Sequence, residues 1–182
     1  AKKDLGLLAM SNGHVYVAYS FVSTSGTRRV VVVARSSDDG ATFLPADVLN
    51  VDDRANPSPL TQEQVFLTTG KDNSVIPARE SVYVGWTELS TGTPTRVRVA
   101  ASPSSNTAGT LPLSFATADV STTGQPRMGD LAVGPNGELY VTWTDYSSSP
   151  ERISWRVRFS GSSCAATSNA WEADWKLRRR DR

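Results

Sequence analysis

A short motif occurs three times along the chain, and this internal repeat restricts the fold more than any other feature of the sequence. The first copy is NGHVYVAY at residues 12–19, the last is NGELYVTW at residues 136–143, and the middle copy is SVYVGW at residues 81–86. The copies recur at roughly sixty residues, and a repeated unit of this kind cannot bury its apolar face alone. The sequence therefore predicts three related units that pack side by side.

The repeated units have the character of β-strands. No stretch shows a sustained 3.6-residue periodicity, and clusters of Ser, Thr and Gly interrupt the chain at short intervals. Asn-Gly pairs directly precede two of the motif strands, where they signal tight turns. Each unit is predicted to hold four short antiparallel strands, beginning with an apolar one at residues 7–10, 65–69 or 131–134. Tyr19, Trp86 and Trp143 are equivalent, which favours a packing role between units over ligand stacking.

A turn of specific chemistry follows the β-branched run at residues 30–34. Asp38 can accept hydrogen bonds from backbone N–H groups just after it, Gly40 can adopt a positive φ, and Phe43 returns an apolar ring to the sheet. The pattern Ser-x-Asp-x-Gly-x-Thr-aromatic resembles the Asp-box of the sialidase-like (BNR) β-propellers. The corresponding segments of the other two units, residues 102–110 and 160–167, lack the Asp. The matching residues are Ser36, Asp38, Gly40, Thr42 and Phe43.

The resemblance implies an all-β fold, a β-propeller of the sialidase-like type with three four-stranded antiparallel blades. The approximate blades are residues 1–51, 52–124 and 125–176, followed by a basic tail at 177–182. A propeller ring usually has about four to eight blades. The expectation is therefore a partial ring whose missing blades belong to a longer parent chain, or a homodimer of six blades. The family also implies an extracellular or periplasmic location.

The face opposite the Asp-box turn is where the resemblance places function. In an antiparallel meander this face collects the loops between second and third strands and the links between units. Asp52, Asp53 and Arg54 are expected in the first link, Arg127 and Asp130 in the second, and Glu88, Asp145 and Tyr146 in the loops.

A sialidase would need arginines that clamp a substrate carboxylate, a Tyr nucleophile assisted by a Glu, and an acid/base Asp. By resemblance, Arg54 and Arg127 are the candidate arginines and Asp145 is a further ligand-binding candidate. The catalytic candidates are Asp53 or Asp130 as the acid and Tyr146 with Glu88 as the nucleophilic pair. The family's aromatic-Arg-Ile-Pro motif is absent, since residues 75–79 read VIPAR. Alternatively, the arginines pair with neighbouring Asp side chains, and Asp145 and Glu88 cap polar turns.

Composition excludes several other classes of protein. The 182 residues carry a net charge of +1, with a basic cluster only in the terminal LRRRDR, so no nucleic-acid-binding face is expected. No apolar run approaches twenty residues, which argues against a membrane span. Cys164 is the single cysteine and His14 the single histidine, so neither a disulfide within the chain, a metal site nor a cofactor is expected.

Three functions remain open at this point. The favoured one is a sialidase-like module that binds a carbohydrate or another small ligand without catalysis. The second is a part of an exo-sialidase or a related glycoside hydrolase. The third is a structural propeller that mediates contacts between proteins.

Overall fold

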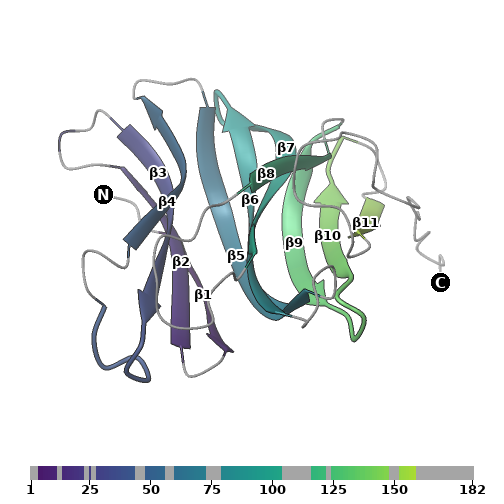
Figure 1. Cartoon of the computed structure of the whole chain (residues 1–182). Helices are drawn as coiled ribbons and strands as arrows, with labels where there is room; N and C mark the ends of the chain where they lie inside the picture. Colours follow the sequence, from purple (N-terminus) through teal and green to yellow (C-terminus); the bar gives the residue numbers. More distant parts are fainter. Residues whose placement is uncertain are drawn as a thin grey trace, which may run out of the picture.

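The computed structural model describes residues 4–11, 14–22, 25, 28–43, 48–55, 60–72, 79–103, 116–121, 124–147 and 152–158, and within these ranges every regular element is a β-strand (Figure 1). The first sheet holds β1 (Asp4–Ser11), β2 (His14–Val22), β3 (Arg28–Ser36) and β4 (Val48–Ala55); the middle sheet holds β5 (Leu60–Asp72), β6 (Arg79–Ser90), β7 (Thr93–Pro103) and β8 (Ala116–Ser121); and the third sheet holds β9 (Pro126–Val133), β10 (Leu139–Asp145) and β11 (Arg152–Arg158). The predicted all-β class is confirmed.

Each sheet is an antiparallel meander in which strands adjacent in sequence are adjacent in space. The first strands of successive sheets also touch, since β1 contacts β5 and β5 contacts β9. Figure 1 shows the three sheets side by side, in the order of the sequence. The prediction of antiparallel sheets is confirmed, and the fourth strand predicted for the third unit would follow β11, outside the described residues.

The repeated motif forms the second strand of every sheet. Tyr16, Tyr83 and Tyr140 lie in β2, β6 and β10, as predicted. The tight turn expected before β10 is also present: Gly137 has φ +87°, and its N–H donates to the carbonyl of Gly134 at 3.0 Å.

An irregularity that the motif did not predict accompanies each of these second strands. The pairing between the first and second strand shifts register close to the repeated aromatic residue, between Leu5 and Leu8 in β1 and between Glu63 and Phe66 in β5. In the third sheet the shift falls between Thr142 and Trp143. Such β-bulges bend a strand and increase its twist, so the three sheets share a local distortion as well as a sequence.

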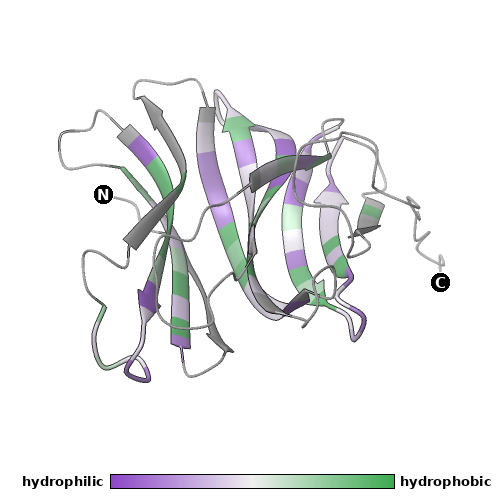
Figure 2. Ribbon diagram, viewed as in Figure 1, coloured by the Kyte–Doolittle hydropathy of each residue, from purple (hydrophilic) through white to green (hydrophobic). Residues whose placement is uncertain are grey.

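Two apolar cores lie on opposite faces of the middle sheet. Alternate residues of a strand point to opposite faces, and β6 follows this rule: Trp86 belongs to the core shared with the first sheet and Tyr83 to the core shared with the third. Figure 2 shows the same alternation of hydrophobic and hydrophilic residues along the strands. The middle sheet is therefore covered on both faces.

Several candidate site residues lie in strands, where links or loops were expected. Asp52, Asp53 and Arg54 lie within β4, opposite Val31, Val30 and Arg29. Arg127 and Asp130 lie within β9, and Glu88 lies within β6. The expected strand ends were wrong because a backbone hydrogen-bond ladder continues through polar residues when a neighbouring strand is present to pair with them.

Candidate functional site

The Asp-box turn is held by hydrogen bonds among its own residues. The Ser36 hydroxyl lies 2.5 Å from Asp38 Oδ1 and accepts the Gly40 N–H at 2.9 Å. The backbone N–H of Thr42 donates to Asp38 Oδ1 at 2.9 Å, and its hydroxyl donates to Oδ2 at 2.6 Å. Gly40 has φ +89°, as the sequence predicts.

These contacts lower the pKa of Asp38 from 3.8 to about 2, chiefly through the hydrogen bonds from the side chains of Ser36 and Thr42. Both carboxylate oxygens are therefore occupied within the turn. Phe43 departs from expectation, because 39% of its surface is exposed and the ring is only partly returned to the sheet. The degenerate box segments of the other units fall mostly at residues 104–110 and 160–167, outside the described residues.

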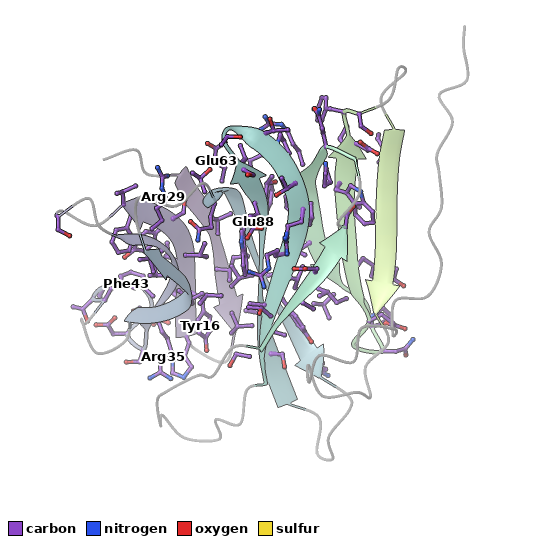
Figure 3. All side chains as sticks on the ribbon, turned by 90° about the horizontal axis from the view of Figure 1, so that it is seen from above. Tyr16, Arg29, Arg35, Phe43, Glu63 and Glu88 are labelled. Atoms are coloured by element: carbon purple, nitrogen blue, oxygen red, sulfur yellow. The ribbon has the colours of Figure 1, made fainter. Side chains whose placement is uncertain are left out.

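A group of four charged side chains lies in the middle sheet, toward the strand ends opposite those that carry the Asp-box turn in the first sheet. We call Glu88, Arg96, Arg98 and Asp119 the charged cluster. The register explains why they meet: Glu88 is opposite Arg96 in the β6–β7 pair, and Arg98 is opposite Asp119 in the β7–β8 pair. Opposed residues in an antiparallel pair project to the same face. In Figure 3, Arg29, Glu63 and Glu88 lie on one side of the view, and Tyr16, Arg35 and Phe43 lie on the other.

Two carboxylates hold both arginines of the charged cluster. Arg96 Nε lies 2.8 Å from Glu88 Oε1, and Arg96 Nη1 lies 3.0 Å from Asp119 Oδ2. Arg98 Nε lies 2.9 Å from Asp119 Oδ1, and its Nη1 lies 3.8 Å from Glu88 Oε2. The Glu88 side chain is only 1% exposed, whereas that of Arg96 is 38% exposed. The cluster thus has a buried acidic floor and a guanidinium that reaches solvent.

Aromatic packing also positions Arg98. Its guanidinium carbon lies 5.6 Å from the centre of the Trp86 ring, which is fully buried in the core between the first and middle sheets. A cation placed over an indole face is stabilised by the ring quadrupole. Since Trp86 and Arg98 are opposite each other in the β6–β7 pair, the same register that joins Glu88 to Arg96 produces this contact.

A hydrogen-bond chain on the other face of β6 ties the middle sheet to the third. The Thr87 hydroxyl donates to Gln64 Oε1 at 2.9 Å and accepts the backbone N–H of Met128 at 2.8 Å. Gln64 lies at the β5 bulge with φ +52°, and Thr87 is fully buried. These hydrogen bonds give the Met128 N–H an acceptor between two sheets, where water has little access.

Asp145 is committed to the local backbone. Its Oδ1 accepts the N–H groups of Gln125 at 3.0 Å and Ser147 at 2.9 Å, and also the Ser147 hydroxyl at 2.7 Å. The N–H of Tyr146 donates to the carbonyl of Gln125 at 3.2 Å, while the Tyr146 side chain is 46% exposed. These contacts match the alternative in which Asp145 caps a polar turn.

The remaining candidates are spread over the first and third sheets. Arg127 and Asp130 are opposite Thr144 and Thr142 in the β9–β10 pair, and Asp130 Oδ1 accepts the N–H of Leu131 at 2.8 Å. Among the residues that the structure describes, none forms an ion pair with Arg127. Asp53 and Arg54 are placed only by their backbone, in β4 of the first sheet.

The structure separates the proposed nucleophilic pair. Glu88 lies two residues after Trp86 and projects toward the first sheet, whereas Tyr146 follows β10 of the third sheet, which packs on the other face of the middle sheet. Glu88 instead forms ion pairs with Arg96 and Arg98. The catalytic roles given to Asp53, Asp130, Tyr146 and Glu88 stay predictions.

Sequence reasoning missed Arg96, Arg98 and Asp119, although a signal existed. An acid follows the repeated Trp by two residues in both later copies, at Glu88 and Asp145, and an Arg is opposite each acid: Arg96 and Arg152. The acid–arginine position is therefore repeated. A repeated position indicates a structural demand, onto which the middle sheet alone adds Arg98 and Asp119.

Comparisons with known proteins provide no family: no family model matches the chain, and no curated protein sequence matches it significantly. The resemblance to sialidase-like propellers rests on the motif residues alone. Among the described residues, no group of three His, Cys, Asp or Glu side chains is arranged to hold a metal ion. The same part of the chain contains no helix with the length and apolarity needed to cross a membrane.

Proposed function

We propose that this chain is a sialidase-like propeller module that binds an acidic carbohydrate, or another small carboxylate, without hydrolysing it. Support for the propeller comes from three consecutive antiparallel meanders whose first strands are in contact, from the shared β-bulges, and from the Asp-box turn after β3. In this proposal each sheet is one blade.

The single observation that carries the binding proposal is the charged cluster. Arg96 is held at Nε by Glu88 and at Nη1 by Asp119, yet 38% of its side chain remains exposed. Among the described residues, its Nη2 has no partner. A guanidinium fixed in this way loses little side-chain entropy when a carboxylate binds to its free edge, and charge-assisted hydrogen bonds of this kind are among the strong ones.

Support for the absence of hydrolysis comes from the contacts of two candidate carboxylates, Glu88 and Asp145. A glycosidase needs one carboxylic acid free to donate a proton and a second group placed to attack. Glu88 is buried and paired with two arginines, and Asp145 accepts one hydrogen bond from Gln125, before β9, and two from Ser147, after β10. In this proposal Glu88 positions the two arginines and Asp145 stabilises the local backbone, and neither acts as a catalytic acid.

The test is a titration of the ¹⁵N-labelled protein with N-acetylneuraminic acid, followed by amide chemical shifts. We expect saturable shifts in β6 and β7. The dissociation constant should be about tenfold higher when the uncharged methyl ester replaces the acid, and also when Arg96→Gln replaces the wild-type protein. Lys71→Gln is the matched control, because Lys71 is an exposed cation near the other end of β5 and should leave the affinity unchanged. Equal binding of acid and ester would reject the anionic-ligand proposal.

A fluorogenic sialoside tests the second half of the proposal. No hydrolysis above background is expected. Turnover that disappears in Arg54→Ala or Arg127→Ala would show instead that the enzyme function implied by the family resemblance is correct, because each variant removes a candidate carboxylate clamp.

A further inference from the structure

The three equivalent tyrosines of the repeat differ sharply in exposure. Tyr16 is 6% exposed and lies in the core between the first and middle sheets, and Tyr83 is 8% exposed and lies in the core between the middle and third sheets. Tyr140 occupies the same place in the third sheet but is 37% exposed. Among the described residues, a following sheet covers Tyr16 and Tyr83 but not Tyr140.

In both covered cases the cover is the first strand of the following sheet. β5 contacts β1, β2 and β3 of the first sheet, and β9 contacts β5, β6 and β7 of the middle sheet. Tyr140 alternates along β10 with the buried Val141, so its face of the third sheet points away from the middle sheet. Ile153 of β11, opposite Thr144, is 52% exposed. Among the described residues no strand covers this outer face.

The other end of the stack carries the complementary surface. Val84 and Trp86 of the middle sheet, and Val141 and Trp143 of the third, are at most 5% exposed because each pair packs toward the preceding sheet. Their equivalents in the first sheet are Val17 and Tyr19, which are only partly buried. Tyr19 is in ring contact with Phe21 on this face, with centroids 5.9 Å apart. Val32 and Val30, which are opposite Tyr19 and Phe21 on this face, are already buried, so the part of the face that remains partly exposed is the row Val17, Tyr19 and Phe21 along β2.

We propose that the outer face of the third sheet, marked by Tyr140, is the docking site for the first sheet of a second copy of this chain. The contact would continue the interfaces already formed twice within the chain, with β1 of the partner in the role of β5 and β9. Thr144 is the equivalent of Thr87, whose hydroxyl accepts a backbone N–H from the covering strand. It therefore supplies the same acceptor to the partner.

Two such contacts close a dimer. If each third sheet covers the partner's first sheet, the outer faces that the described residues leave uncovered are buried in both chains, and the two contacts are related by a two-fold axis. Tyr140 and Ile153 are both exposed on this face, about 13 Å apart along the strands, and exposed apolar side chains on one sheet face are a feature of interaction sites. This inference concerns assembly and is independent of the ligand proposed for the charged cluster.

Sedimentation velocity of the full chain at micromolar concentration tests the docking site. We expect a dimer for the wild-type protein and a dissociation constant raised at least about tenfold in Tyr140→Arg and in Tyr19→Arg, since a charge would be buried in each contact. Tyr146→Arg is the matched control, because Tyr146 is an exposed tyrosine outside the strands and should leave the dimer intact. Far-UV circular dichroism and thermal melts check that each variant remains folded.

Mixing the two variants identifies which faces meet. In an equal mixture of Tyr140→Arg and Tyr19→Arg, one of the two contacts of a mixed dimer has both native tyrosines, so dimer is expected to reappear. A wild-type monomer would overturn the proposal. So would a dimer that Tyr140→Arg weakens but Tyr19→Arg does not, because third sheets would then face each other.

Discussion

The Asp-box turn and the charged cluster are both polar networks built on carboxylates, but they are assembled over very different distances in the sequence. Every partner of Asp38 lies within four residues of it, and the turn is exposed. Glu88 and Asp119 meet the same two arginines from β6 and β8, and Glu88 is buried. One network belongs to a single turn, and the other exists only when three strands are paired.

Because of this difference, the two networks contribute differently to the stability of the fold. Bonds in an exposed turn replace bonds to water, so their net contribution to stability is small and their effect is to fix the shape of the chain. A buried carboxylate has no water to return to, so the loss of its partners, or of the carboxylate itself, is costly. The charged cluster should therefore dominate the response to mutation.

The largest effect is expected for Glu88→Gln. Removing this buried charge leaves Arg96 and Arg98 with Asp119 as their remaining acidic partner in the cluster, and we expect a loss of about 3 kcal/mol in the free energy of unfolding. Asp119→Asn is the control, with a loss of about 1 kcal/mol, because that side chain is 33% exposed and water can replace part of the pairing. Urea denaturation measures both. Equal losses of unfolding free energy in the two variants would show that the burial of Glu88 does not cause the larger effect.

An intermediate effect is expected for Thr87→Val, which tests a buried long-range bond that carries no charge. The substitution keeps the shape of the side chain but leaves the Met128 N–H without its acceptor, which costs about 1–3 kcal/mol. Thr87→Ser retains the hydroxyl and should recover most of the loss. Hydrogen exchange at the Met128 amide should accelerate in the valine variant alone, and an unchanged exchange rate would contradict the role given to Thr87.

The smallest effect is expected at Asp38, and it depends on pH. Its pKa is lowered from 3.8 to about 2 in the folded state, so its stabilisation is complete above about pH 4 and is lost as the pH falls through about 2. The melting temperature of Asp38→Asn should therefore lie below that of the wild type at neutral pH and approach it at low pH. A carboxyl ¹³C titration should give the low pKa directly. A gap in melting temperature that persists unchanged to pH 2 would disprove the link.

Much of the fold was accessible from the sequence, and the strand ends were not. The repeat located β2, β6 and β10, and the Asp-box pattern located the turn after β3. The expected loop positions of Asp53, Arg127 and Glu88 are wrong, because a polar residue does not by itself end a strand. A strand continues as long as a neighbour satisfies its backbone groups, and that neighbour is defined only by the complete sheet.

The candidate site was harder to predict for the same reason. Arg96 and Arg98 alternate along the sequence in the manner of one strand face, but their partners come from other strands. Without the strand register, the sequence cannot indicate whether Glu88 pairs with Arg96 or with Arg127.

The sequence by itself indicated the repeated strand, because its short apolar pattern recurs three times, and it indicated the Asp-box turn, because that turn is held by contacts between residues at most four positions apart. Tertiary structure alone decided which acid meets which arginine, and it decided the environment of the repeated tyrosine. Tyr16 and Tyr83 are buried and Tyr140 is exposed, although the sequence around them is nearly the same. Burial is a property of the surface that packs against a residue, and a strand cannot encode in its own sequence whether another sheet lies over it.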